Sequence, residues 1–156
     1  MERTNITLQR RTLGGLLRML EETTRSRVYA RMAEAGFPDI RPAHSSLFRN
    51  MTTSGGSRVT DLAERAQMTK QSMGYLADSL EALGYVTVGP DPTDRRAKLV
   101  WFTKRGDAAG RAMARLSAEI EREYAALIGE ADMAQLRRSL ERLAERLIGD
   151  PGSAPA

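Results

Sequence analysis

The sequence predicts a mainly α-helical chain that carries one small β-hairpin. Three observations lead to this fold class. Apolar residues recur at helical spacing through most of the 156 residues. The spacing changes to strict alternation at residues 85–88 and 99–103. A polar stretch containing Gly and Pro, residues 89–98, separates these two short runs and is typical of a hairpin loop.

The length and composition exclude several classes of protein. A chain of this length corresponds to one domain, with or without helical attachments, and can bury its own core. It contains no cysteine, which excludes disulfides, thiolate metal sites and a cysteine redox switch. No stretch approaches the ~18 uninterrupted apolar residues of a membrane span, and charged residues interrupt the apolar run after Arg10-Arg11 that an export signal needs. We therefore expect a cytoplasmic protein.

The N-terminal third predicts one long helix and one short helix. Leucines and other apolar residues follow helical spacing over residues 8–35, with arginines and glutamates on the other face. Gly36-Phe37-Pro38 ends this helix, and Pro42 is suited to begin the next, over residues 43–53. Residues 52–57 form a polar, glycine-rich loop.

The middle of the chain predicts two helices joined by a tight turn. Residues 59–66 form a short helix with Thr60 as its N-cap, and Gln67-Met68 form the turn. Thr69 caps a longer helix over residues 70–83, which Gly84 ends. Its apolar stripe contains Met73, Leu76, Ala77, Leu80 and Leu83, and its opposite face contains Lys70, Gln71, Gly74, Tyr75 and Asp78.

The C-terminal third predicts two further helices. Thr103 caps a helix that runs to about residue 128, and Gly129 ends it. The last helix covers residues 132–148 and is followed by a tail, residues 149–156, that we expect to be disordered. One stripe of the last helix consists of Leu136, Leu140, Leu143 and Leu147.

A short helix, a turn, a longer helix and a hairpin together form a winged helix-turn-helix. In this arrangement the second helix lies in the major groove of DNA. Gln71 is suited to bidentate contact with adenine, and Lys70 to phosphate or guanine. Such a polar face taken alone is more often merely solvated, but its combination with the hairpin favours DNA contact.

The hairpin tip carries the tripeptide Asp94-Arg95-Arg96. An arginine on a projecting loop can enter a narrow minor groove, where negative potential is concentrated, and an adjacent aspartate can orient its guanidinium. The alternative is an ordinary turn with a salt bridge.

Residues 91–106, DPTDRRAKLVWFTKRG, closely resemble the wing signature of the MarR family of bacterial transcription regulators. That signature has Asp-x-Arg at the wing tip, followed by a Leu-Thr-x-x-Gly turn in which Phe102 here replaces leucine. Residues 59–66 and 69–72 resemble the family's helix-turn-helix, and the resemblance extends over about residues 8–148. It implies that Arg96 enters the minor groove, that Asp94 positions it, and that residues 70–79 read the major groove. Tyr75 stands where the family often has arginine, which leaves the base preference open.

The complete set of expected DNA-binding residues is Thr69, Lys70, Gln71, Ser72, Gly74, Tyr75, Asp94, Arg95, Arg96 and Lys98.

The resemblance also implies a homodimer in which helices at both ends of the chain interlock. It divides the chain into a helical dimerisation region, residues 8–35 and 107–148, and a winged helix-turn-helix domain, residues 43–106. The apolar stripes agree, because one small winged domain cannot cover both of them; packing within one chain is the alternative. A two-fold dimer would bind a pseudo-palindromic site in double-stranded DNA.

The resemblance further implies a small aromatic or anionic effector, bound between the dimerisation helices and the winged domain. The candidate residues are Arg18, Phe37, His44, Phe48, Arg49 and Met51, although core packing is an alternative role for Phe48 and Met51. His44 is the only histidine, and no metal-ligand spacing or catalytic constellation is present. We therefore expect that the protein binds no metal or cofactor and is not an enzyme.

The net charge of +4 comes from a basic excess in residues 1–106, since residues 107–156 are weakly acidic. This distribution fits a DNA-facing part and a dimer-forming part. The sequence therefore predicts a dimeric, sequence-specific DNA-binding transcription regulator, a repressor whose DNA affinity a small ligand changes. The alternative is a winged-helix module that binds a protein partner.

Overall fold

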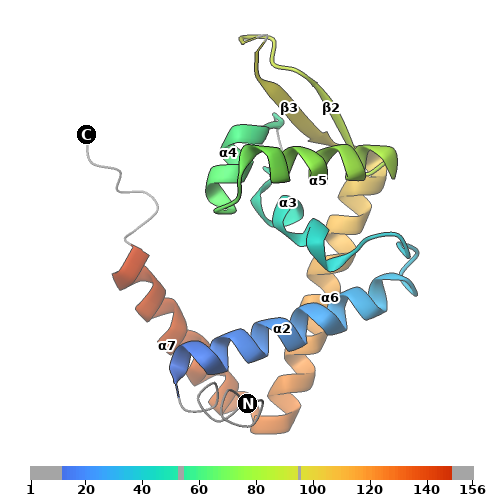
Figure 1. The fold of residues 1–156 in the computed structure, drawn as a ribbon. Helices are drawn as coiled ribbons and strands as arrows, with labels where there is room; N and C mark the ends of the chain where they lie inside the picture. The colour runs from blue at the N-terminus through green and yellow to red at the C-terminus, as the bar shows by residue number, and fades with distance from the viewer. Residues whose placement is uncertain (1–11, 53–54, 95, 149–156) are drawn as a thin grey trace, which may run out of the picture. The chain divides into compact units, whose positions relative to one another are not determined.

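The structure is a computed structural model that describes residues 12–52, 55–94 and 96–148 (Figure 1). It is mostly helical and contains a small antiparallel sheet, so the predicted fold class is confirmed. The chain forms two compact units, residues 1–117 and 118–156. The predicted tail and the first residues of the predicted N-terminal helix lie outside the described residues.

The first unit begins with α2 (Leu13–Met32), whose N-cap is Thr12. The Thr12 hydroxyl accepts the backbone N–H of Gly15 at 3.1 Å. The helix ends three residues before the predicted end, because Gly36 adopts a left-handed φ of 96° and the N–H of Phe37 bonds back to the carbonyl of Met32. The predicted short helix consists of a 3-10 turn, η1 (Pro42–His44), and α3 (Ser45–Asn50), so it ends earlier than the predicted residue 53.

The helix-turn-helix consists of α4 (Val59–Arg65) and α5 (Lys70–Ala82). Thr69 caps α5 as predicted. The prediction that Thr60 caps α4 is wrong: the N-cap residue is Arg58, because it is still extended in a strand and the chain turns helical directly after it. Gln67 closes the turn with a left-handed φ of 52°.

The sheet has the order β1-β3-β2, with all neighbours antiparallel. Its strands are β1 (Ser57–Arg58), β2 (Val86–Pro90) and β3 (Lys98–Phe102). The structure corrects the predicted strand boundaries. Residue 57, predicted in a loop, belongs to a third strand, and residues 89, 90 and 98 belong to the hairpin ladder, so the wing loop is only residues 91–97. The predicted first strand also begins one residue later, at Val86.

The core of the winged domain lies between α5 and the sheet. Met73, Ala77 and Leu80 of the predicted apolar stripe are buried, as are Val86 and Val100 on the strands. On the opposite face of α5, Lys70, Gln71, Ser72, Tyr75 and Asp78 are exposed and Gly74 is half-buried. The helical periodicity therefore identified the two faces of α5 correctly.

Two long helices complete the chain: α6 (Lys104–Ile128) and α7 (Glu130–Ile148). Thr103 begins α6 as predicted, since its hydroxyl accepts the N–H of Gly106 at 3.1 Å. Gly129 separates the helices with a φ of 95°, so α7 begins two residues before the predicted start. Within the second unit, Arg137 of α7 pairs with Glu121 of α6. Among the described residues, no helix is long and apolar enough to cross a membrane.

Candidate nucleic-acid interface

The N-terminal turn of α5 presents a short run of exposed polar side chains. The Thr69 hydroxyl accepts the backbone N–H of Ser72 at 3.1 Å, and the two hydroxyl oxygens are 2.8 Å apart. Lys70, Gln71 and Ser72 are all exposed. This cap satisfies one of the free N–H groups and leaves the side chains of the first turn directed to solvent.

One turn further along α5, Gln71 and Tyr75 form a polar pair. The Gln71 amide nitrogen lies 3.4 Å from the Tyr75 hydroxyl, and Tyr75 is 67% exposed. Gly74 lies beside them, and a Cβ added to it would meet nothing within 4 Å. The backbone at Gly74 is therefore open to close approach by another molecule.

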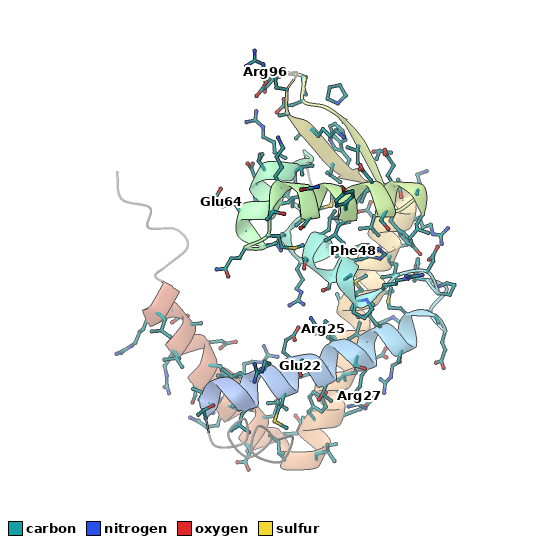
Figure 2. All side chains as sticks on the ribbon, viewed as in Figure 1. Glu22, Arg25, Arg27, Phe48, Glu64 and Arg96 are labelled. Atoms are coloured by element: carbon teal, nitrogen blue, oxygen red, sulfur yellow. The ribbon has the colours of Figure 1, made fainter. Side chains whose placement is uncertain are left out.

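The wing tip is folded by Asp94. Its carboxylate accepts the backbone N–H of Arg96 at 3.0 Å, and its carbonyl accepts the N–H of Ala97 at 2.9 Å. Asp94 thus contacts Arg96 through the backbone and leaves the guanidinium exposed at the end of the hairpin (Figure 2). Arg95, also expected to bind DNA, lies outside the described residues.

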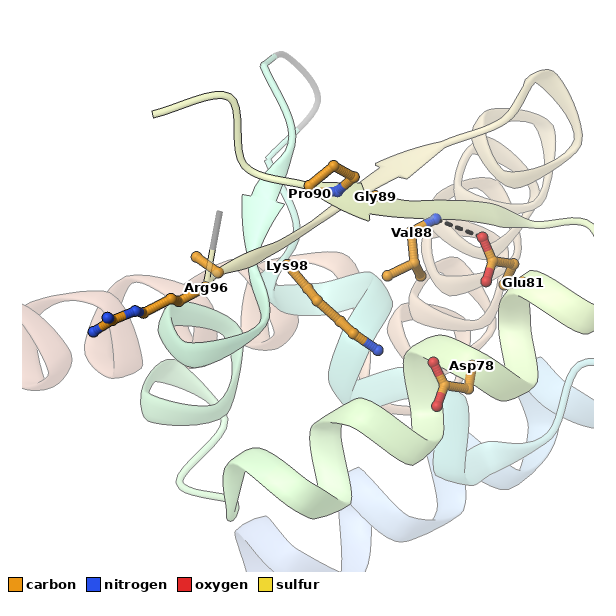
Figure 3. Close-up of a pocket in the computed structure, with 8 residues that line it drawn as sticks. Asp78, Glu81, Val88, Gly89, Pro90, Arg96 and Lys98 are labelled. Atoms are coloured by element: carbon orange, nitrogen blue, oxygen red, sulfur yellow. Dashed lines mark hydrogen bonds between the residues drawn. The ribbon is translucent and has the colours of Figure 1, made fainter. Parts of the chain in front are cut away.

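A cavity of about 430 Å³ separates the C-terminal half of α5 from the wing (Figure 3). Two acidic side chains from α5 and two basic side chains from the wing line it, and Lys98 points toward α5. The Glu81 carboxylate accepts the backbone N–H of Val88 at 2.6 Å. Because β2 is an edge strand, this bond pairs an N–H that β3 does not, and it fastens the wing to α5. The lining residues are Asp78, Glu81, Val88, Gly89, Pro90, Arg96, Ala97 and Lys98.

Three side chains that the sequence analysis missed meet at the root of the wing. Arg58 of β1 places Nε 2.6 Å from Oδ2 of Asp91 and Nη2 3.2 Å from the Thr93 hydroxyl. The other Asp91 oxygen accepts the Thr93 hydroxyl and backbone N–H, both at 2.7 Å. These bonds from Thr93, supplemented by the Arg58 guanidinium, lower the pKa of Asp91 to about 2. The Asp-Pro-Thr sequence is a recognisable turn signal, but no local sequence pattern identifies Arg58 as the partner of Asp91.

Two of the expected effector residues belong to an aromatic cluster around the buried Tyr85. The rings of Phe37 and Phe48 lie 6.2 and 6.3 Å from that of Tyr85, and Phe48 stacks on Phe102 at 5.4 Å. The Tyr85 hydroxyl donates to Asp39, which lowers the pKa of this carboxyl. The Arg105 guanidinium is also bonded to Asp39, at 3.0 Å, and lies 4.6 Å from the centre of the Tyr85 ring.

The remaining expected effector residues have different surroundings. His44 is buried, with Nδ1 accepting the backbone N–H of Arg41 and Nε2 3.3 Å from the Ser79 hydroxyl. Met51 is buried, Arg18 is exposed, and Arg49 pairs with Glu21 at 3.1 Å. The effector site therefore stays a prediction. Over the described part of the chain, no three or more His, Asp or Glu side chains are grouped to hold a metal ion.

Comparison with known proteins agrees with the geometry of this region. Residues 39–97 match the model of the MarR family. The chain is also similar to the transcriptional activatory protein BadR of Rhodopseudomonas palustris, with 30% identity over 92 residues. That match covers 59% of this chain and 51% of BadR, so it spans about half the length of that protein.

Solved structures resemble the chain over most of its length. The crystal structure of MarR has a TM-score of 0.73 at 22% identity and covers 87% of this chain and 97% of that one. The transcriptional repressor CouR, bound to a 23-mer DNA duplex, has a TM-score of 0.68 at 22% identity, covering 85% and 92%. PcaV from Streptomyces coelicolor, in complex with its natural ligand, has a TM-score of 0.61 at 18% identity, covering 86% and 93%. At these identities the similarity establishes the winged helix-turn-helix fold.

Proposed function

We propose that this chain is a sequence-specific, DNA-binding transcription regulator of the MarR family, whose model residues 39–97 match. The observation that carries the proposal is the arrangement of two exposed features on one winged domain. The first is the polar N-terminal turn of α5, with an open backbone at Gly74. The second is the wing tip, where Arg96 is exposed and folded into place by Asp94.

Each feature suits a different groove of B-form DNA. The first turns of α5 would lie in the major groove, where Gln71 and Lys70 reach base edges and phosphates. The wing would place Arg96 in the neighbouring minor groove, where a narrow groove attracts a guanidinium. CouR, which has the same fold, is described as bound to a DNA duplex, and this supports the assignment.

Selection of bound sites from random duplexes, followed by substitution of Arg96, tests the proposal. We expect a pseudo-palindromic site whose affinity falls with salt, by about 0.9 in log–log slope for each phosphate neutralised. Arg96→Ala should weaken binding by roughly 1–3 kcal/mol. Arg111→Ala, which removes an exposed arginine from α6, is the matched control and should have little effect. Equal losses of affinity in the two variants would contradict the role of Arg96. If the chain bound no duplex but captured a protein partner, the protein-binding alternative would be favoured.

We also propose that the regulator is a cytoplasmic homodimer that represses transcription and loses DNA affinity when a small aromatic or anionic effector binds. CouR is described as a repressor and PcaV as bound to its natural ligand, whereas BadR is described as an activator. Titration of aromatic carboxylates into the protein–DNA complex tests the effector, and a promoter fusion tests the sign of regulation. Release of DNA by none of them would count against this class of effector.

A further inference from the structure

We propose that Arg58 and Asp91 are positioning residues that hold the wing loop, residues 91–97, in the conformation that presents Arg96 to DNA. This inference rests on the proposed DNA-binding function and adds to it a mechanism of wing alignment. Neither side chain is required to touch DNA for this role. Arg58 immediately precedes α4, and Asp91 begins the loop that ends in the wing tip.

The Arg58 guanidinium links the helix-turn-helix to the wing at two points. Its Nε bonds to Asp91 at 2.6 Å and its Nη2 to the Thr93 hydroxyl at 3.2 Å. β1 consists of only two residues, so backbone pairing gives this edge of the wing little support. A rigid guanidinium with two partners fixes both a distance and an orientation, which a single charge cannot do.

Asp91 holds the first residues of the wing loop in place. Only 4% of it is exposed, although it is charged, so its partners must compensate for the loss of hydration. Its backbone N–H donates to the carbonyl of Ala97 at 3.0 Å and closes the loop across the hairpin. The Asp94 bonds to Arg96 and Ala97 lie inside this closed loop. Loss of the Asp91 carboxylate would therefore loosen the turn that presents Arg96.

The opposite margin of the wing has its own attachment, the Glu81 bond to the edge of β2 (Figure 3). Glu81 extends from α5, whereas Arg58 extends from β1, so the wing is fastened to the helix-turn-helix on both sides. Of the two attachments, only the one at Asp91 reaches the loop that carries Arg96.

The sign of the effect separates positioning from simple electrostatics. Asp91→Asn removes a negative charge close to the proposed DNA-binding surface, which by Coulomb attraction alone should strengthen binding. The proposal requires the opposite, because the amide cannot accept the same set of charge-assisted bonds. We expect affinity about tenfold weaker, within the range for loss of one groove arginine. Glu64→Gln makes the same charge change at an exposed position on α4 and should leave affinity unchanged or increase it.

A charge-conserving variant provides the second arm. Arg58→Lys keeps the cation but cannot bond to Asp91 and Thr93 together. If Arg58 acted only as a phosphate contact, lysine would replace it with little loss. We expect instead that Arg58→Lys weakens binding about as much as Asp91→Asn, and this variant also serves if Asp91→Asn does not fold.

The Arg96 dependence distinguishes positioning from general destabilisation. In an Arg96→Ala background, Asp91→Asn and Arg58→Lys should each weaken DNA binding by less than a further factor of about two. Both substitutions act through the Arg96 side chain, which is already absent. All affinities would be compared under conditions in which each variant is fully folded. Urea melts establish these conditions, with unfolding monitored by the fluorescence of Trp101, the only tryptophan.

Binding by Asp91→Asn as tight as wild type, or losses that simply add to that of Arg96→Ala, would overturn the inference while leaving the proposed function intact. A wild-type chain that binds no duplex would overturn both.

Discussion

His44 was expected to contact an effector, but its hydrogen bonds in the structure give it a structural role. The backbone N–H of Arg41 donates to its Nδ1 at 3.1 Å, so the neutral ring carries its proton on Nε2 and donates it to the Ser79 hydroxyl. Ser79 belongs to α5 and Arg41 to the segment before η1. The neutral ring thereby joins α5, the recognition helix of the proposed function, to the segment that precedes η1, and a proton on Nδ1 would place two donors face to face.

This arrangement predicts that the protein loses stability in mild acid. Burial, together with the nearby Arg41 charge, lowers the pKa of His44 below its ordinary 6.5. The unfolded chain therefore binds more protons than the folded one in this range, and the free energy of unfolding should decrease as the pH falls from about 7 toward the lower folded pKa. Urea melts at pH 7.5 and 5.5 measure the change.

His44→Gln provides the control, because glutamine does not titrate. Carboxyls such as Asp39 and Asp91 have pKa values lowered below 3.8 and contribute little between pH 5.5 and 7.5. A wild-type free energy of unfolding that does not change across this interval would contradict the assigned tautomer and burial of His44.

At the scale of elements, the start of α6 depends on one glycine. Thr103 bonds through its hydroxyl to the carbonyl of Gly84 at 2.7 Å and through its backbone N–H to that of Tyr85 at 3.0 Å, so α6 begins against the start of β2. Gly106 lies in this contact: a Cβ there would be 1.9 Å from the Tyr85 carbonyl oxygen. The glycine after the wing is thus required by a close backbone approach.

We predict opposite effects for two glycine-to-alanine substitutions on α6. Gly106→Ala forces the helix away from the strand and should lower the free energy of unfolding by roughly 1–3 kcal/mol, as for overpacking. Gly110→Ala, one turn later, meets nothing within 4 Å and should raise it by about 0.5–1 kcal/mol, because alanine favours a helix. Chemical denaturation of the two variants measures both; destabilisation by Gly110→Ala as large as by Gly106→Ala would refute the close-approach argument.

The elements that the sequence predicted well are those with repeated patterns. Three or more turns of apolar spacing located α5 and both of its faces, whereas two-residue β1 has no pattern to detect. The Gly89-Pro90 pair indicated a turn, yet the ladder continues through it. On edge strand β2 the N–H of Val88 points away from β3 to Glu81, and Pro90, two residues on, lacks an N–H at an equally outward position.

At the scale of the whole molecule, sequence reasoning reached the candidate interface only in part. The exposed face of α5 follows from periodicity, and the wing residues from a family signature. The Arg58–Asp91 pair does not, because it joins positions 33 residues apart and depends on strand pairing that no local pattern reveals. The same holds for the Asp39–Tyr85–Arg105 group, whose members come from three separate segments.

Most of the large apolar side chains that are exposed in the described part of the chain are leucines on its long helices. On α2, the apolar spacing predicted over residues 8–35 includes Leu13, Leu16, Leu17 and Leu20, and these four leucines are 39–55% exposed. On α7, Leu136 and Leu143 are each 40% exposed and Leu147 is 75% exposed. Aligned exposed leucines on a helix face favour a surface that another chain covers, and a second copy with two-fold symmetry would also supply the second recognition helix that a pseudo-palindromic site needs.

We therefore predict a dimer at micromolar concentration in sedimentation velocity, and a monomer for Leu16→Glu/Leu20→Glu. Charges buried in an apolar interface are costly, so the variant should dissociate while its winged domain stays folded. Glu22→Lys, on the opposite face of α2, is the control and should remain dimeric. A monomeric chain presents one recognition helix, so the variant should also lose the preference for paired half-sites over a single half-site. A wild-type chain that is monomeric and still prefers paired half-sites would contradict this prediction. The preference for paired half-sites would then not depend on these leucines, and their exposed faces would bind some other partner.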